Sequence, residues 1–275
     1  MVVQHNLTAA NTNRQLGITT SGLQKSTEKL SSGYKINRAA DDAAGLSISE
    51  KMRNQIRGLN KASDNAQDGI SLVQTAEGAL NEVHSMLQRM SELSVQAANG
   101  TNDTTDRSSI NDEIQQLKTE IERVGNTTQF NKMNILDGTF STGANKLLQV
   151  GANANQTIKV DIDALKSVVG SSLKGDLKTE TATNAQSAIT VVQNSIEKLS
   201  KLRSKLGAVQ NRLEHTVANL DNISENTQSA ESRIRDTDMA EEMVQYSKNN
   251  ILQQAGQSML AQANQANQGV LSLLQ

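Results

Sequence analysis

The sequence contains no cysteine, no proline and no tryptophan, and aromatic residues make up only 1% of its 275 residues. Without cysteine, the chain forms no disulfide and has no thiolate for catalysis or metal binding. The absence of proline removes the strongest breaker of helix interiors and permits long uninterrupted helices. The core must therefore be built from aliphatic side chains, methionine and alanine, which is typical of long packed helices.

Charge and hydropathy exclude several classes of partner. The formal net charge of −2 gives no reason to expect nucleic acid or an anionic membrane as a partner. No apolar run approaches the ~20 residues that a bilayer-spanning helix needs. The chain start lacks the basic and apolar regions of a secretory signal peptide. We therefore expect no nucleic-acid partner and no membrane partner, and, if the protein leaves the cell, a route without a cleaved signal peptide.

Residue patterns that carry catalysis or metal binding are missing as well. The three histidines, His5, His84 and His215, stand alone, without the HExxH spacing of zinc sites. Nucleotide-binding glycine loops and the GxSxG nucleophile motif do not occur. Asp41 and Asp42 precede a helical pattern and are interpreted as helix caps, not as an acid–base or metal pair. We expect no catalytic residues, no metal, no cofactor and no enzyme.

Both chain ends are uncharged and carry an apolar stripe. Residues 251–275 contain no charged side chain and no histidine, and residues 1–13 carry no formal charge. Apolar and small residues at the C-terminal end alternate at steps of three and four, the spacing of a coiled-coil seam. A neutral face suits contact between identical copies, because like charges do not repel. The predicted self-assembly seam comprises Leu252, Gly256, Met259, Ala263, Ala266, Val270 and Leu273, with Val3, Leu7 and Ala10 at the other end.

The rest of the chain reads as long helices around a short region of strands. The first helix continues through leucines spaced by seven to about Ser31, followed by a connector at 32–40. Further helical patterns run from about 43 to 98, from about 103 to 124 and, with the most regular heptad, from 185 to 234.

Between them, 130–165 alternates as two hairpins, with turns predicted at Asp137-Gly138 and at GANANQ, and 166–183 is predicted as an exposed loop. The predicted fold is mainly α: a long antiparallel coiled-coil helical rod with small β-hairpins in the middle of the chain. Residues 1–40 and 235–275 form a discontinuous terminal domain, and 41–234 form the rod domain.

Three long stretches, 23–58, 67–100 and 231–265, closely resemble bacterial flagellin. The match covers nearly everything except about 139–183. The resemblance implies that the two chain ends form an inner coiled coil around a filament channel and that the long helices and a hairpin form a shell outside it. Many flagellins insert outer domains in the middle, and this chain resembles the short forms that lack them.

The resemblance also implies a life cycle. Such subunits are exported unfolded without a cleaved signal peptide, bind an export chaperone through the C-terminal region and polymerise outside the cell into the filament used for motility. The partners implied are other copies of the chain, the chaperone, and the cap and junction proteins.

Flagellins further carry a surface that Toll-like receptor 5 of vertebrates recognises. Its motif maps onto QRMSELSVQ at 88–96, so the resemblance assigns Gln88, Arg89 and Leu93 to it, with Glu113 on the adjoining helix. Ser91 and Leu117 stand where many strongly recognised flagellins have arginine. Arg89 and Glu113 can also be interpreted as an ordinary solvated helix face or as a contact between subunits, and we favour the contact.

Two other functions remain open at this point. A hook–filament junction protein shares the helical ends but does not polymerise at length, and a secreted coiled-coil effector or adhesin would bind host proteins without self-assembly. A proteolytic flagellin would need an inserted metal motif, which the sequence lacks.

Overall fold

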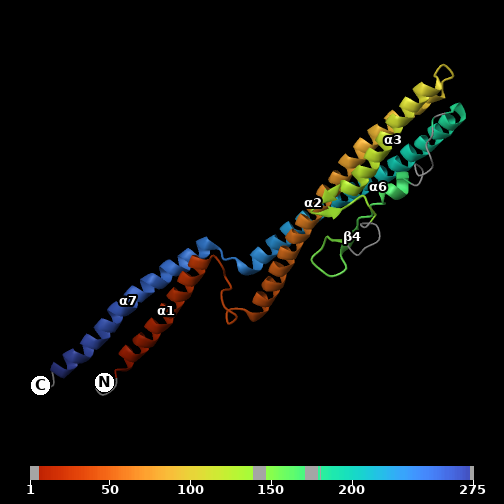
Figure 1. Cartoon of the computed structure of the whole chain (residues 1–275). Helices are drawn as coiled ribbons and strands as arrows, with labels where there is room; N and C mark the ends of the chain where they lie inside the picture. Colours follow the sequence, from red (N-terminus) through yellow and green to blue (C-terminus); the bar gives the residue numbers. More distant parts are fainter. Residues whose placement is uncertain (1–5, 139–146, 171–178, 180, 273–275) are drawn as a thin grey trace. The chain divides into compact units, whose positions relative to one another are not determined.

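The structure, a computed structural model, describes residues 6–138, 147–170, 179 and 181–272, without the side chains of residue 182 and residues 266–272. In the described part, no helix is long and apolar enough to cross a membrane. The elements in chain order are α1 (Leu7–Ser32), α2 (Ala43–Ala98), α3 (Thr104–Thr127), β1 (Gln129–Phe130), β2 (Met133–Asn134), β3 (Leu147–Gln149), β4 (Thr157–Lys159), η2 (Lys166–Gly170), α6 (Ala182–Arg235) and α7 (Met239–Ser272). This confirms the predicted mainly α class with two small antiparallel strand pairs (Figure 1).

The chain divides into two compact units. Unit 1 comprises residues 1–54 and 225–275, and unit 2 comprises residues 55–224. The predicted domains meet at the two connectors, whereas these two units divide inside α2 and α6. The reason is that the start of α2 and the end of α6 pack with the connectors: Arg235 bonds to Glu50, and Ile36 lies against Gly45.

Helix ends follow the capping chemistry of the sequence. The Asp42 carboxylate accepts the N–H of Gly45 at 2.9 Å, as predicted for the N-cap of α2. Asp41, predicted as a second cap, instead accepts the backbone N–H groups of Asn37 and Arg38 within the connector, because only the residue next to the helix reaches its free N–H groups. α3 begins at a capping box formed by Asp103 and Asp106.

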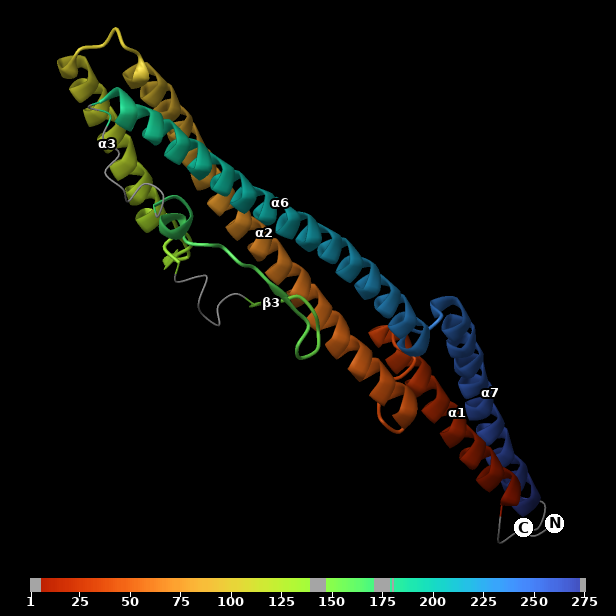
Figure 2. The same cartoon turned by 90° about the vertical axis from the view of Figure 1, so that its right-hand side faces the viewer.

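Unit 2 contains a continuous apolar core between α2, α3 and α6, which lie side by side in both views (Figures 1 and 2). The predicted seams of α2 and α6 supply most of it. Toward residue 224 the α6 seam becomes more exposed, with Ile223 37% exposed. The fully buried large side chains of the core include Leu80, Leu87, Met90, Ile114, Leu199 and Leu206.

A polar layer closes this core where α2 and α6 approach the unit boundary. Ser63 donates to the Asp221 carboxylate at 3.1 Å, and Ser224 donates to the Asn60 amide oxygen at 2.7 Å. Buried hydroxyls with partners on the opposite helix make a register slip costly, because a slip would leave them unpaired.

The first hairpin differs from the prediction in the position of its turn. β1 and β2 pair around Asn131 and Lys132, whose φ angles are 48° and 63°. Two consecutive left-handed residues are the signature of a type I′ turn, which asparagine favours at its first position. The predicted turn at Asp137-Gly138 lies past β2 and does not close this hairpin, although Gly138 also has a positive φ of 95°.

The second hairpin lies where the sequence predicted it. β3 and β4 pair with Leu148 opposite Ile158, and residues 150–156 connect them. Its loop rests on α2 at Gly58, where an added Cβ would lie 2.8 Å from the Cβ of Ala152 and 3.2 Å from its Cα. A glycine is therefore required there for close approach of helix and loop.

The predicted exposed loop at 166–183 is contradicted at two places, although Lys166, Ser167, Thr181 and Thr183 are exposed. Residues 166–170 form the helical turn η2, whose Val169 is fully buried in the core. Thr179 is also fully buried and donates to the side chain of Asn111 on α3. Apolar Val169 and the pairing of Thr179 explain why this segment packs inward. Residues 171–178 and 180 lie outside the described residues.

Candidate functional site

α1 and α7 form an antiparallel pair within unit 1, with the start of α1 beside the end of α7 (Figure 1). The Asn6 amide donates to the carbonyl of Ala263 at 3.0 Å, and the Lys29 ammonium lies 3.3 Å from the Glu242 carboxylate at the other end of α1. Between these contacts, an added Cβ on Gly256 would lie 3.3 Å from Leu16. The two neutral chain ends are therefore partners of each other, as the sequence predicted.

The α1 side of this pair differs from the predicted stripe. Leu7 is 73% exposed and Ala10 is also exposed. Continuing the leucine repeat backwards from Leu16 by seven leads to Ala9, and Leu7 lies on the opposite side of the helix from it. The repeat also includes Thr19 and Ser26, which are 9% and 4% exposed. Sequence reasoning missed these two hydroxyls, although their spacing between the leucines marks their place.

On α7, the predicted seam faces α1 but remains half open. Gly256 and Ala263 contact α1, whereas Leu252 and Met259 line a groove beside Leu16 and are 47% and 57% exposed. A pair of helices covers only one side of a side chain, so the groove stays accessible. Ala266 and Val270 belong to α7 but their side chains lie outside the description, as do Val3 and Leu273 entirely.

A second apolar stripe on α7 was not predicted. Val244 and Ile251 are each 66% exposed and lie seven residues apart, on one face of the helix. Ile251 precedes Gly256 by five residues, which is about 140° around the helix, so this stripe points away from α1. No formal charge occurs from Asn249 to the end of α7. α7 thus presents one face to α1 and a second face to solvent.

The residues assigned to receptor recognition form a polar bridge between α2 and α3 in unit 2. Arg89 Nε donates to Glu113 Oε1 at 3.0 Å, and its Nη1 donates to Glu92 Oε2 at 3.3 Å. The hydrogen bond to Glu113, and then that to Glu92, raises the pKa of Arg89 above its ordinary value. The side chains of Arg89 and Glu113 are 51% and 45% exposed, so the bridge is accessible.

Two neighbours of this bridge behave differently. The amide Nε2 of Gln88 lies 3.2 Å from the Nε2 of His84, on the exposed side of α2. Leu93 is only 2% exposed and belongs to the apolar core. The structure therefore corrects the assignment of Leu93: its side chain points inward on the core seam of α2 and supports the surface only from below.

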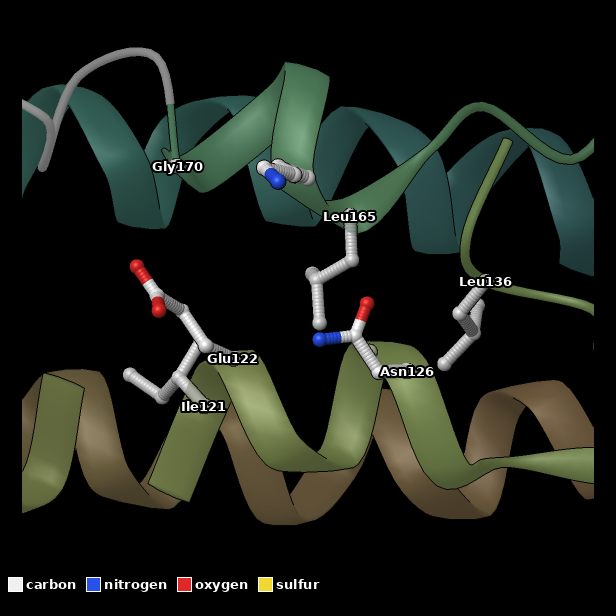
Figure 3. A pocket seen from close by; sticks show the side chains of 8 residues that line it. Ile121, Glu122, Asn126, Leu136, Leu165 and Gly170 are labelled. Atoms are coloured by element: carbon white, nitrogen blue, oxygen red, sulfur yellow. The ribbon is translucent and has the colours of Figure 1, made fainter. Parts of the chain in front are cut away.

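A small pocket lies between α3 and η2 (Figure 3). Figure 3 shows the Leu165 side chain directed at α3, where it comes within 3.2 Å of a Cβ built on Gly125. The polar side chains of the lining are those of Glu122, Asn126 and Lys166, and Glu122 and Lys166 are both exposed. Among the described residues, no group of three acidic, histidine or cysteine side chains could hold a metal ion. We interpret the pocket as a packing contact.

Two family models match the chain. The bacterial flagellin N-terminal helical region matches residues 3–141, and the bacterial flagellin C-terminal helical region matches residues 189–274. Flagellin of Halalkalibacterium halodurans is 58% identical and flagellin of Bacillus subtilis is 52% identical, in both cases over 100% of this chain and 100% of the relative.

Solved structures resemble the chain as well. The crystal structure of Bacillus cereus flagellin is 32% identical with a TM-score of 0.50, over 57% of this chain and 88% of that chain. A candidate flagellar hook-associated protein from Vibrio parahaemolyticus is 13% identical with a TM-score of 0.60, over 71% of this chain and 100% of that chain. At this identity the second likeness concerns the fold alone.

Proposed function

Since the chain belongs to the bacterial flagellin family, we propose that α1 and α7 are the surface through which its copies assemble. As a flagellin, the protein is a structural subunit of the flagellar filament outside the cell, it serves motility, and it is not an enzyme. The proposal concerns which residues make the contacts between subunits.

The observation that carries the proposal is the concentration of exposed apolar side chains in unit 1. Thirteen large apolar side chains of the described residues are exposed, and nine of them lie in this smaller unit. Covering such surface contributes roughly 25 cal/mol per Å² removed from water, and repetition along a polymer multiplies a weak contact. The nine are Leu7, Ile18, Ile48, Met239, Met243, Val244, Ile251, Leu252 and Met259.

The two stripes of α7 have different roles in this proposal. The stripe with Gly256 and Ala263 holds α1 within one subunit, and its open residues Leu252 and Met259 offer a groove beside it. The outer stripe with Val244 and Ile251 is free for a neighbouring copy. Absence of charge beyond residue 248 lets equal surfaces approach without repulsion.

The test compares two lysine substitutions at exposed apolar positions. Ile251→Lys places a charge on the outer stripe and should abolish filament formation in negative-stain electron microscopy and in pelleting assays. Val95→Lys changes a residue of α2 that is 56% exposed, and should assemble normally. Both variants should unfold like the parent by circular dichroism, because neither side chain is buried. A normal filament yield from Ile251→Lys would contradict the assignment of the outer stripe.

The inner groove has its own test. Met259→Lys and Ala263→Asp place charge beside α1 and should prevent polymerisation while the core helices of unit 2 stay folded. If both variants form filaments in normal yield, the seam of Leu252, Gly256, Met259 and Ala263 plays no part in assembly.

We propose that α1 and α7 also bind the export chaperone before assembly and the cap and junction proteins during assembly. An apolar stripe that is open in the single subunit favours aggregation unless it is covered, and an export chaperone on α7 would supply the cover. Cap and junction proteins would meet the same helices at the ends of the filament. Export without a cleaved signal peptide belongs to this proposal. The chaperone in excess should suppress polymerisation of the parent. It should bind the Ile251→Lys variant more weakly than the parent.

We further propose that Gln88, Arg89 and Glu113 form a recognition surface for Toll-like receptor 5. The support is the exposed bridge between two helices, which holds Arg89 in one orientation. Arg89→Ala should lower receptor signalling in reporter cells, whereas Arg123→Ala should not, since Arg123 forms a similar exposed pair with Glu120 within α3 alone. Unchanged signalling together with failed polymerisation of Arg89→Ala would assign the bridge to a contact between subunits instead.

The two other functions considered from the sequence are less well supported. Relatives that match along their whole length are flagellins, whereas the hook-associated protein shares only the fold. Long filaments formed by the purified chain alone would exclude a junction protein, which joins or caps without polymerising. A secreted coiled-coil effector would remain monomeric under the same conditions.

A further inference from the structure

The turn that joins α2 to α3 contains the pair Asn99-Gly100, the one place in the sequence where glycine follows asparagine (Figure 1). α2 ends at Ala98 and α3 begins at Thr104, so both residues lie outside the helices, and both are exposed. Asparagine is a thermolabile residue, and a following glycine has no Cβ that would keep other atoms away from its backbone nitrogen. The pair therefore combines a reactive side chain with an unhindered neighbour.

Neither reacting group of this pair is held by a hydrogen bond. The Asn99 side-chain amide and the N–H of Gly100 make none to any described residue, whereas the N–H of Asn99 donates to the carbonyl of Gln96 at 3.1 Å. Inside a helix, by contrast, each N–H is bonded to the carbonyl four residues earlier and leaves it only if the helix opens. The turn therefore leaves the Asn99 amide free to rotate toward the nitrogen of Gly100.

The backbone on either side of the pair is held by α3 and by the turn itself. Arg107 Nε donates to the carbonyl of Ala97 at 3.1 Å, and its Nη2 donates to the carbonyl of Asn99 at 3.1 Å. The Asn102 side chain donates to the carbonyl of Gln96 at 2.6 Å. These donors satisfy carbonyls that the end of α2 leaves without a helical partner. Asn99 thus has an anchored carbonyl and an unanchored side chain.

From these observations we propose that Asn99 is a site of spontaneous deamidation. The backbone nitrogen of Gly100 loses its proton and attacks Cγ of Asn99, which closes a five-membered succinimide ring. The bond from Cγ to Nδ2 breaks, and Nδ2 leaves with that proton as ammonia. Water then opens the ring: cleavage between the nitrogen and Cγ gives aspartate, and cleavage between the nitrogen and the backbone carbonyl carbon gives isoaspartate. The reaction consumes water, releases ammonia and needs no enzyme.

Both products place a carboxylate at the C-terminal end of α2, in a chain whose formal net charge is −2. A negative charge there opposes the helix dipole. In isoaspartate the new carboxylate is the former backbone carbonyl group of Asn99, the acceptor of Arg107, and the backbone gains one carbon atom. Because only water and time are required, the modified fraction rises with the age of the protein. The charge at residue 99 thus distinguishes old subunits from newly made ones.

Peptide mapping of the folded full chain tests the proposal. Trypsin cleaves after Arg89 and Arg107, so Asn99 lies in the peptide 90–107. During incubation at neutral pH this peptide should gain the mass difference between a hydroxyl and an amino group. Fragmentation should place the change at residue 99, in an aspartate form and an isoaspartate form that elute separately.

An internal comparison is available in the same digest. Asn194 is also exposed and is followed by the small residue Ser195, but both lie inside α6. Its deamidation should be slower on the order of tenfold or more, because the helix holds the N–H of Ser195. Equal rates at Asn99 and Asn194 would overturn the role of the turn.

Two variants separate the chemistry from the structure. An added Cβ at Gly100 meets nothing within 4 Å, so Gly100→Ala should preserve the turn, yet its methyl group should slow deamidation of Asn99 on the order of tenfold. Asn99→Gln keeps the amide but would require a six-membered ring, and no product should form at residue 99. An unchanged rate in Gly100→Ala would overturn the attack by the Gly100 nitrogen.

The last comparison asks whether the folded turn permits the reaction. The rate at Asn99 in the folded chain should lie within about tenfold of the rate in guanidinium chloride, because an exposed turn opens at little cost. A reaction that occurs only in the unfolded chain would show that the turn protects Asn99 and would overturn the proposal. None of these measurements depends on polymerisation, so failure of the assembly proposal leaves them unaffected.

Discussion

Units 1 and 2 are both built from long helices with an apolar seam, but the two units bury the side chains of that seam to different extents. In unit 2, three helices and two hairpins surround the core, and the seam leucines of α2 and α6 are buried. In unit 1, two helices share a seam with the same spacing, yet Leu252 and Met259 stay about half exposed. The number of neighbours around a helix, and not its heptad pattern, decides whether an apolar residue stabilises the subunit or remains available for another copy.

Truncating one leucine in each unit should give the largest difference between them. Leu206→Ala removes a fully buried side chain of unit 2, and we expect a loss of about 2–5 kcal/mol in the free energy of unfolding. Leu252→Ala removes a side chain that is 47% exposed, and we expect less than about 1 kcal/mol. Urea unfolding followed by circular dichroism measures both. Similar losses would show that the helix pair is buried in solution.

Two glycines of α2 test how closely unit 2 is packed. Gly58→Ala pushes a methyl group against the backbone of Ala152, and we expect a net loss of about 1 kcal/mol from overpacking. Gly78→Ala meets nothing within 4 Å and should instead gain roughly 0.5–1 kcal/mol from helix propensity. Thermal unfolding of both variants reports the sign. A stabilising Gly58→Ala would mean that the second hairpin does not rest on α2.

A smaller effect is expected when a buried hydroxyl of the α1–α7 pair is replaced by an apolar group, as in the core of unit 2. Thr19→Val replaces a buried hydroxyl that bonds only to its own helix at Gln15, and we expect the α1–α7 pair to gain less than about 1 kcal/mol from the added apolar contact. Thr27→Val is the control, because Thr27 makes the same bond to Leu23 but is exposed. Hydrogen exchange near residue 19 should slow only in Thr19→Val. Slowing in both variants would point to helix propensity.

The smallest effect concerns pH and is confined to the connector between α1 and α2. The backbone N–H of Arg38, supported by that of Asn37, lowers the pKa of Asp41 below its ordinary value. Because the folded value is the lower one, the stabilisation is present above the unfolded pKa of about 3.9 and is lost as the pH falls through the folded value. Exchange at residues 37–38, corrected for intrinsic rates, should lose protection on acidification, and Asp41→Asn should lack this response. A parent without any response would show that the Asp41 carboxylate does not stabilise the connector.

Much of the site could be predicted because it depends on periodicity. Residues Gly256 and Ala263 follow a repeat that places them on one helix face whatever surrounds it. Leu7 and Ala10 do not face α7, because the helix partner follows the phase set by Leu16, and their place in the self-assembly seam stays a prediction. The outer stripe with Val244 and Ile251 was not predicted, because two residues spaced by seven are too few to indicate a helix face. Their exposure depends on which helices pack against α7.

What the sequence by itself determined is the set of long helices, their caps and the neutral ends, since these depend on neighbours within one or two turns of chain. Only the tertiary structure decided that Leu93 lies inside, that Thr179 is buried, and that Arg235 bonds to Glu50. Each of these depends on segments that are far apart along the chain. Contacts of that kind are selected by packing and by the cost of leaving a buried polar group unpaired, and no local pattern encodes them.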